Sequence, residues 1–323
     1  MTRVVAPSRL HFGLLHVPVE GLTHWPDGLP VRRFGGVGLM VNAPSIAVRV
    51  ESAAEWSGHG PNGHRALGYA RQVAATLTDG STRSLEVTVE RCPPEHVGLG
   101  VGTQLGLAVA LAVTTELGFP GMKCAELSRW VGRAERSGIG SHGFARGGLL
   151  VEGGKRGAEV SVLLGRYEFP TDWRIVLARP HTSQATWSGG AEQQAFSRAR
   201  SADVILPLTE RMSRVLLVGL LPALLERDCV TFGKAVQEYN RLAGHMFAND
   251  QGGNYSSPLV QRLVVAAERY GATGAGQSSW GPTVFALCAD HEVAQTVSDG
   301  LGRDFNALDV VITSGNNTGA VLT

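Results

Sequence analysis

A glycine-rich turn that runs directly into a helix with apolar residues on every side constrains this fold most. The turn, residues 98–102, reads GLGVG, and the segment 102–116 that follows it has no polar face. Its large apolar residues are Leu105, Leu107, Val109, Leu111 and Val113. A helix that is apolar all round has to be buried all round. We therefore expect this helix to lie at the centre of the fold.

The glycines of this turn indicate a chemical role for the start of the helix. Gly98, Gly100 and Gly102 let the backbone close on a ligand, and the first amide hydrogens of a helix have no partner within it. Together with the positive end of the helix dipole, these amides form a phosphate site. Thr103 and Gln104 can add side-chain hydrogen bonds. No GK[ST] follows this turn, and the turn does not match GxGxxG, so a turn needed only for close packing remains an alternative.

The remaining pattern predicts an α+β protein with two halves. Its 323 residues exceed what one core usually serves. Alternating apolar residues predict strands over 44–51 and 84–91, and further strand-like segments lie at 148–152, 160–164, 174–178, 283–288 and 309–313. Helical spacing covers 63–78, 188–220, 229–246, 257–270 and 291–301. Because strands and helices cluster and do not alternate, we expect an N-terminal domain, residues 1–165, carrying the phosphate-binding turn, and a C-terminal domain, residues 166–323.

Charge and composition exclude several functional classes. Lys plus Arg number 29 and Asp plus Glu number 28, so the chain lacks the broad basic face that nucleic-acid binding requires. The four cysteines are far apart without CxxC spacing, which favours a reducing compartment. Arg9 and His11 interrupt the only candidate signal peptide, and glycines open the longest uncharged stretch. We expect a soluble cytoplasmic protein that binds neither nucleic acid nor membrane.

Two further glycine clusters and one cationic pair complete the candidate site. The clusters are RSGIGSHGFARGGLL, residues 136–150, and GATGAGQSSWGPTVFAL, residues 271–287. Near the start, APSRLHFGLLH places Arg9 and His11 two residues apart, on one face if the segment is a strand. Such a pair suits an anionic substrate, although a histidine that is merely packed or solvated is the common case.

These motifs carry a family resemblance. The order APSRLHFGLLH, GLGVGTQ, TGAGQSSWGP resembles the three motifs of the GHMP kinase superfamily. In detail, SRLHFGLL, FGGVGLM, GLGVGTQLGLAVA and RSGIGSHGFARGG are similar to the β-ribofuranosylaminobenzene 5′-phosphate synthases, over nearly the whole chain. The resemblance implies the two-lobed GHMP kinase-like fold, a homodimer and an Mg²⁺ cofactor. It also implies phosphoribosyl transfer from phosphoribosyl pyrophosphate (PRPP) to 4-aminobenzoate or 4-hydroxybenzoate, with release of pyrophosphate and carbon dioxide, in methanopterin-type coenzyme synthesis.

The departures from a true kinase fit the synthase. Where GHMP kinases typically carry GLGSSA, with a hydroxyl that helps to hold Mg²⁺, this chain has Val101 and Gly102. The segment 137–142 lacks the aspartate base of many such kinases, and Arg9 replaces the lysine of their APGK motif. His16 stands where some synthases have an acidic residue. An ATP-dependent GHMP small-molecule kinase and a non-catalytic GHMP-fold metabolite sensor remain alternatives.

The resemblance and the residue chemistry together give each candidate a role. Arg9, Arg32 and Arg33 are expected to clamp phosphate or carboxylate groups, and His11 to orient or handle a proton. The segment 274–280 is expected to be a loop that closes over the substrate. The expected pyrophosphate ligands are Gly98, Gly100, Gly102, Thr103 and Gln104. Expected substrate contacts are Ser8, Ser137, Gly140, Ser141, Arg146, Gly274, Gly276, Gln277, Ser278, Ser279 and Trp280, with Glu135 and Asp250 as metal ligands.

Overall fold

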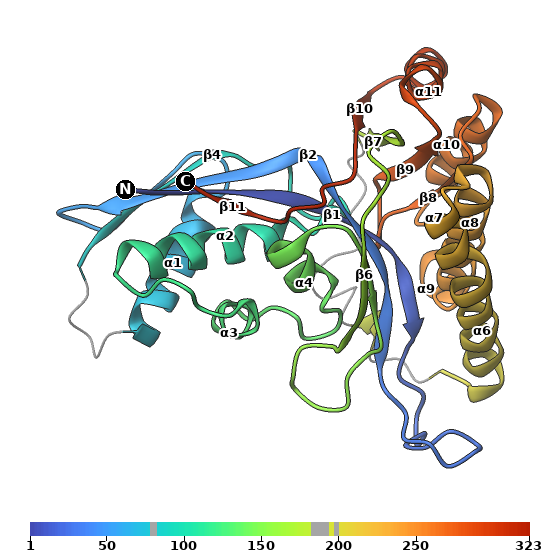
Figure 1. Cartoon of the computed structure of the whole chain (residues 1–323), viewed down its shortest axis with the longest axis horizontal. Helices are drawn as coiled ribbons and strands as arrows, with labels where there is room; N and C mark the ends of the chain where they lie inside the picture. The colour runs from blue at the N-terminus through green and yellow to red at the C-terminus, as the bar shows by residue number, and fades with distance from the viewer. Residues whose placement is uncertain (78–82, 182–193, 197–199) are drawn as a thin grey trace.

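Two sheets, antiparallel apart from the parallel pair β3 and β4 and connected through the long strand β1, organise the chain (Figure 1). The computed structural model describes residues 1–77, 83–181, 194–196 and 200–323. The larger sheet has the order β11-β1-β2-β4-β3, and β5 and β6 extend it from β2. Its strands are β1 (Thr2–His16), β2 (Phe34–Ser52), β3 (Ser57–His59), β4 (Leu85–Arg91), β5 (Leu149–Glu152), β6 (Leu163–Tyr167) and β11 (Val321–Leu322). The smaller sheet has the order β10-β7-β9-β8, from β7 (Arg174–Pro180), β8 (Gly274–Gln277), β9 (Val284–Cys288) and β10 (Leu308–Thr313).

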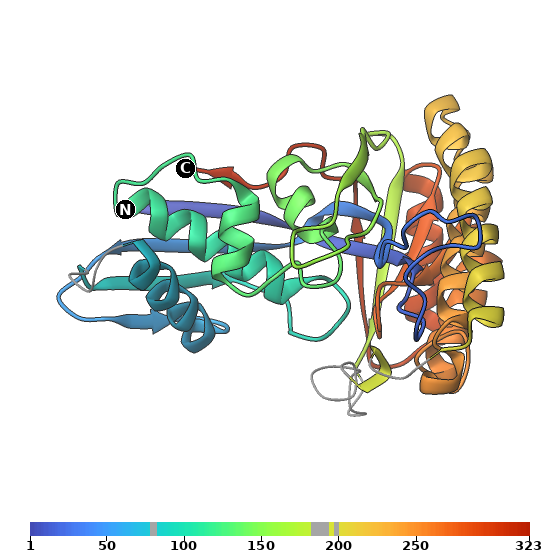
Figure 2. The same ribbon diagram turned by 90° about the horizontal axis from the view of Figure 1, so that it is seen from below.

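The strand β1 bends because its register with β2 shifts twice. The shifts lie between Ala6 and Ser8 and between His11 and Gly13, and bulges of this kind re-aim a strand. Figure 2 shows β1 running from the end where both termini lie toward the second lobe. At the other end of β1, Phe12 meets Phe285 of β9 with ring centroids 4.9 Å apart. One strand therefore carries side chains into both lobes.

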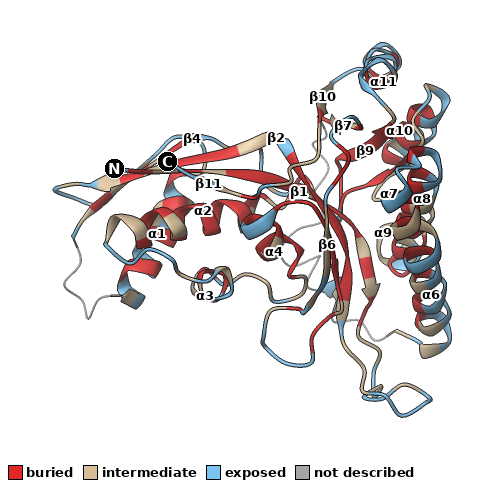
Figure 3. Ribbon diagram, viewed as in Figure 1, coloured by how far each residue is buried: buried red, intermediate tan, exposed pale blue. Residues whose placement is uncertain are grey.

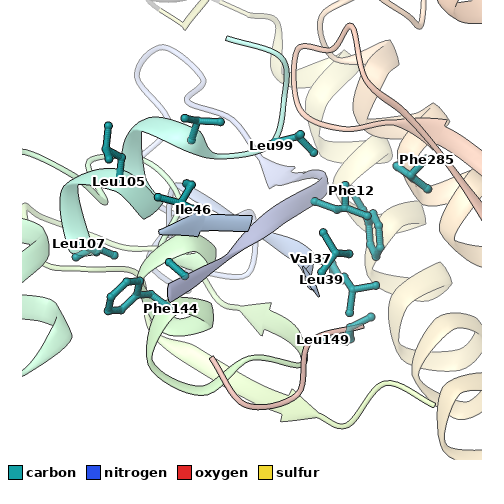
Figure 4. Close-up of a cluster of buried hydrophobic side chains, with 14 of the residues drawn as sticks. Phe12, Val37, Leu39, Ile46, Leu99, Leu105, Leu107, Phe144, Leu149 and Phe285 are labelled. Atoms are coloured by element: carbon teal, nitrogen blue, oxygen red, sulfur yellow. The ribbon is translucent and has the colours of Figure 1, made fainter. Parts of the chain in front are cut away.

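The central helix predicted from sequence is α2 (Val101–Glu116), and the prediction is confirmed. It packs against β1 and β2 on one side and against α1 (Gly63–Leu77), α3 (Cys124–Trp130) and α4 (Ile139–Arg146) on others. Leu105, Leu107 and Val109 are fully buried. Figure 3 shows α2 as an almost wholly buried element, and Figure 4 shows Leu105 and Leu107 within the same core as Ile46.

A layer of helices covers the smaller sheet (Figure 1). It consists of α6 (Ala202–Val215), the π-helical turn η1 (Leu216–Leu220), α7 (Leu221–Glu226), α8 (Cys229–His245), α9 (Ala248–Gln251), α10 (Pro258–Arg269) and α11 (His291–Asp304). Asn240 ties α8 to both lobes: its Nδ2 donates to the carbonyls of Phe12, at 2.7 Å, and Gln277, at 2.8 Å. None of the helices in the described ranges has both the length and the apolar character needed to cross a bilayer.

The α+β class is confirmed, and most predicted elements agree with the structure within a few residues. The strand expected over 160–164 lies at 163–167. Of the helix expected over 188–220, residues 194–196 are helical and α6 begins at Ala202, where Ser201 caps it by accepting from the Asp203 amide. Residues 188–193 and 197–199 of that expected helix lie outside the described part. The proposed domain division after residue 165 falls within β6 and stays a prediction.

One expected loop is a strand over part of its length. We expected residues 274–280 to close over the substrate as a loop, but Gly274–Gln277 form β8, all four buried between β9 and α8. The prediction of a loop is wrong for these four residues. At Gly274 and Gly276 the lack of a side chain instead lets β8 lie against Gly233 and Asn240 of α8. Only residues 278–280 belong to a turn.

Candidate active site

The turn before α2 has the features of an anion site. Gly100 takes a left-handed conformation, with φ 69°, and provides no side chain to cap the helix. The first turn of α2 contains no acidic residue that would neutralise the positive helix end. The turn is fastened to β1, because the Arg9 amide donates to the carbonyl of Leu99 at 3.0 Å. The backbone geometry therefore supports the expected phosphate-binding turn.

Three guanidinium groups converge on this turn. A Cβ atom placed on Gly100 would lie 2.8 Å from Nε of Arg9. A Cβ atom on Gly102 would lie 3.0 Å from a terminal nitrogen of Arg65 and 3.2 Å from one of Arg133. The three arginines come from β1, α1 and the segment after α3, so distant parts of the chain build one cationic surface.

Tyr69 fixes the two arginines that sequence reasoning missed. Its hydroxyl accepts a hydrogen bond from Nε of Arg65 at 3.1 Å and another from Arg133. Arg65 also pairs with the carboxylate of Glu95. Nothing in the local pattern singles out Arg65 or Arg133. Arg65 lies in the first turn of an amphipathic helix, and Arg133 precedes the second glycine cluster, so only the tertiary fold brings them to Gly102.

Two adjoining hollows meet at these arginines. The smaller, of about 180 Å³, follows the turn from His96 to Gly102 and includes Arg65 and Glu95. The larger, of about 310 Å³, lies between the lobes and includes His11, Glu135 and Ser137. Both are lined by the same five residues: Arg9, Thr103, Arg133, Ser279 and Trp280. A ligand could therefore extend from one hollow into the other.

Aromatic side chains form one wall of the larger hollow. Phe196, Phe247 and Trp280 lie edge to face, with ring centroids 4.7 to 5.8 Å apart. The guanidinium of Arg136 lies 4.2 Å from the centroid of the Phe196 ring and also faces the hollow. Such a wall suits a planar apolar ring with a negative substituent. Trp280 was expected as a substrate contact, whereas the two phenylalanines were missed because no motif marks them.

His11 is held as a neutral imidazole. It is almost fully buried; its Nδ1 accepts from the Gly13 amide at 3.2 Å, and its Nε2 lies 3.0 Å from the Ser137 hydroxyl. Burial, reinforced by the charge of Arg9, lowers the pKa of His11 well below its usual value. Because both ring nitrogens have partners, His11 fits the orienting role that was one of its two expected functions.

The structure brings most of the predicted site residues to the two hollows. Gly98, Gly100, Gly102 and Thr103 line the smaller, and Arg9, His11, Thr103, Glu135, Ser137, Gly140, Gln277, Ser279 and Trp280 line the larger. Several others support these walls from behind. Gln104 donates to the carbonyl of Gly140 at 2.8 Å, Ser278 donates to that of Gly98 at 2.7 Å, and Ser141 accepts from Ser128 at 2.7 Å.

A few predicted residues lie away from the hollows. Arg32 donates to the carbonyls of Gly153 and Gly154, and Arg33 donates to that of Arg156. Both arginines therefore hold the segment after β5, and neither lines a hollow. Ser8 donates to the carbonyl of Pro44, and Arg146 is exposed near the end of α4. Their expected roles as clamps or substrate contacts stay predictions.

The two predicted metal ligands differ in their surroundings. Asp250 accepts from Arg200 at 2.8 Å with both side chains nearly buried, so its charge is already paired. Glu135 lines the larger hollow. Within the described residues, no three His, Cys, Asp or Glu side chains gather closely enough to hold a metal ion. The expected Mg²⁺ and its ligands stay predictions.

Sequence comparison identifies the family. The GHMP kinases C terminal family matches residues 220–307. A protein of Methanothermobacter thermautotrophicus, named beta-ribofuranosylphenol 5′-phosphate synthase, is 33% identical over 98% of this chain and 97% of its own. The chain belongs to the β-ribofuranosylphenol 5′-phosphate synthase family. A protein of the same name from Archaeoglobus fulgidus is 30% identical over 89% of this chain and 88% of its own.

Solved structures show the fold of this synthase family member independently. The homoserine kinase of Cytophaga hutchinsonii superimposes with a TM-score of 0.66 at 18% identity, covering 100% of this chain and 97% of that one. The GHMP kinase-like fold expected from the three glycine motifs is therefore confirmed. The synthase family expected from SRLHFGLL and GLGVGTQ is confirmed as well.

Proposed function

We propose that this chain transfers the phosphoribosyl group of PRPP to a 4-substituted benzoate, 4-hydroxybenzoate or 4-aminobenzoate, with release of pyrophosphate and carbon dioxide. The observation that carries the proposal is the pair of adjoining hollows, one cationic and one aromatic, which share Arg9 and Arg133. The family relatives are named for a ribofuranosylphenol 5′-phosphate product, which supports this reaction class.

The cationic hollow is the proposed site of the pyrophosphate. When pyrophosphate departs from C1 of the ribose, positive charge develops on the sugar and negative charge on the pyrophosphate. Groups fixed in advance around that anion lower the barrier. Arg9, Arg65, Arg133 and the first amides of α2 provide such groups. Mg²⁺ carried by the diphosphate would neutralise further charge. Of the two predicted metal ligands, Glu135 lines the adjoining larger hollow.

The aromatic hollow is the proposed site of the benzoate. Phe247 and Trp280 can stack on its ring, and Arg136 faces the same space and can meet the carboxylate. Placed this way, the ring lies next to the five residues common to both hollows. We therefore assign C1 of the ribose to this junction.

The proposed reaction needs no net proton transfer. The C1–oxygen bond breaks, and pyrophosphate leaves with the electron pair. The ring carbon that bears the carboxylate then bonds to C1 with a pair from the ring. The bond to the carboxylate breaks, its electrons return to the ring, and carbon dioxide leaves. Positioning rather than a strong base is the main requirement, which agrees with a neutral His11.

A product assay by mass spectrometry tests the proposal. Incubation with PRPP, Mg²⁺ and either benzoate is expected to give the decarboxylated C-riboside 5′-phosphate, with pyrophosphate and carbon dioxide in equal amounts. Absence of product with both acids, together with ATP-dependent phosphorylation of an alcohol, would establish the kinase alternative. Binding of PRPP without turnover would establish the sensor. The homodimer and the cytoplasmic location stay predictions.

A further inference from the structure

A buried carboxylate that no motif predicted lies behind the wall of the larger hollow. Glu152, the last residue of β5, is fully buried, and its Oε2 accepts a hydrogen bond from the Gly138 amide at 2.6 Å. Its Oε1 makes no hydrogen bond of ordinary geometry within the described residues. A buried carboxylate with one unpaired oxygen is costly to keep unless it has a function.

Glu152 connects to the hollow through Ser137. The Ser137 hydroxyl lines the hollow, and its oxygen accepts from the Ile139 amide at 3.2 Å. Because Nδ1 of His11 accepts from Gly13, Nε2 of the neutral ring carries the hydrogen and donates to Ser137. The serine oxygen therefore accepts two hydrogen bonds, which leaves its own hydrogen available to the Glu152 carboxylate, which the adjacent Gly138 amide binds.

This chain of groups spans the two walls of the hollow. Ser137 and Gly138 belong to the segment before α4, whereas His11 and Gly13 flank the register shift of β1. The direction of the hydrogen bonds depends on Glu152. An ionised carboxylate accepts from Ser137, but a protonated one can donate to the serine oxygen and compete with His11 for it.

We propose that Glu152 is a positioning residue whose ionised form orients Ser137 and His11 and thereby fixes the two walls of the acceptor hollow relative to one another. Its predicted effect on turnover rests on the proposed function. Its coupling to Ser137 does not, and can be measured without substrate.

Several groups set the charge of Glu152. Burial raises its pKa to about 7, and the Gly138 amide, the nearby hydroxyls of Ser137 and Ser161 and the charge of Arg9 limit the rise. Other titratable groups near it are His11 on β1, Lys155 after β5 and Tyr239 on α8. His142 on α4 faces the same point beside Gly138.

The pH dependence of turnover follows from this arrangement. Above about pH 7 Glu152 is ionised and the chain of hydrogen bonds runs from His11 toward it. Below that pH the carboxyl gains a proton, and kcat should fall. The KM for PRPP should not rise over the same range, because losing a negative charge beside Arg9 cannot weaken binding of an anion.

The first experiment compares kcat and KM between pH 5.5 and 8.5 for the wild type and Glu152→Gln. Glutamine can still accept from Gly138 and can donate to Ser137, so it reproduces the protonated side chain. We expect kcat of this variant to be roughly 10- to 100-fold lower at pH 8 and to lack the acidic limb. Glu168→Gln, at an exposed carboxylate beyond β6, is the matched control and should keep the wild-type profile.

The second experiment needs no turnover. The carboxyl stretch of Glu152, identified by its loss in Glu152→Gln, is titrated by infrared spectroscopy in the wild type and in Ser137→Ala. Ser137→Ala removes the hydroxyl that donates to the ionised Glu152 carboxylate, so the pKa of Glu152 should rise. An unchanged titration in Ser137→Ala, or an acidic limb of kcat retained in Glu152→Gln, would overturn the proposal. If the wild type forms no product, the proposed function fails and the infrared titration alone decides this inference.

Discussion

The side chain of Arg9 lies so close to Gly100 that no other residue fits there: a Cβ atom on Gly100 would lie 2.8 Å from Nε and 3.2 Å from Cβ of Arg9. Gly100 also needs its left-handed φ of 69° to begin α2. The phosphate-binding turn and its nearest cation therefore form one rigid unit. In this unit the glycine is required for contact with the arginine as well as for its backbone conformation.

Gly100→Ala should therefore strongly reduce turnover in a protein that still folds. The added methyl group displaces the Arg9 guanidinium, and we expect kcat/KM for PRPP to fall by roughly 100-fold or more, corresponding to about 3 kcal/mol. Gly118→Ala, just beyond the other end of α2, is the matched control, since Gly118 has φ 87° and nothing within 4 Å of the added atom. Each variant should lose about 1 to 3 kcal/mol of stability. Equal kinetics in the two variants would show that the contact with Arg9 is irrelevant.

Arg65 and Arg133 should be required for catalysis although no motif marks them. Replacing either by methionine removes a fixed cation from the pyrophosphate hollow and should cost about 2 to 4 kcal/mol of transition-state stabilisation, seen as a fall in kcat/KM. Arg71→Met is the control, because Arg71 lies on the same helix but stacks on Trp56, outside both hollows. Pyrophosphate affinity measured by calorimetry should fall in the first two variants alone. A loss in all three would indicate damage to α1 instead.

The aromatic wall should determine affinity for the acceptor. Phe247→Leu removes one ring that can stack on the benzoate, so KM for the acid should rise by roughly 2- to 10-fold, equivalent to about 0.5 to 1.5 kcal/mol. KM for PRPP should stay the same. Phe119→Leu, at a half-exposed ring remote from the hollows, should change neither value. A rise in KM for PRPP without one for the acid would reverse the assignment of the two hollows.

Stability should decrease with rising pH because of Glu152. Its pKa is raised from 4.5 in the unfolded chain to about 7 in the fold, so the folded state holds one more proton between these values. The contribution to stability is complete below about pH 4.5 and is lost as pH rises through 7, a total of about 3 kcal/mol. Chemical denaturation of wild type and Glu152→Gln at pH 5 and pH 8 measures it. The stability of the wild type relative to the variant should fall over this range, and a constant difference would contradict the assigned burial of the charge.

His16 should have the opposite effect on stability at lower pH. Burial lowers the pKa of His16 from 6.5 to about 4, and its Nε2 is buried without a partner among the described residues. The stability that depends on the neutral ring is present above pH 6.5 and is lost as pH falls toward 4. His16→Gln, which can keep the contact with Thr209, should therefore lose less stability than the wild type between pH 6.5 and 4.5. Parallel curves would show that His16 titrates normally.

Local pattern accounts for much of the fold. The central helix was predictable because an apolar surface on every side leaves no solvent-facing position. The strand β4 followed from its alternation, and β7 from a short apolar run. β8 was not predictable in this way, because Gly274 and Gly276 cannot contribute to an alternating apolar pattern. Glycine is required at both positions because α8 lies too close for a side chain. The π-helical turn η1 likewise has no signature in its apolar sequence.

The site was predictable only where its residues lie within one motif. The turn 98–102 and the pair Arg9 and His11 are local features, and the structure brings them together. Arg65, Arg133 and Glu152 reach the site from separate elements, so their convergence depends on long-range pairing. Arg32 and Arg33 are conspicuous in the sequence but do not line the site. Both donate to backbone carbonyls of the segment after β5.

The most direct test of the account is a crystal structure of the protein with PRPP bound and no acceptor present. The account predicts the diphosphate at the first amides of α2, within hydrogen-bonding distance of Arg9 and Arg133, and C1 of the ribose at the junction that Thr103 and Trp280 line. A diphosphate bound against Phe196 and Phe247, or anywhere remote from residues 98–104, would contradict it.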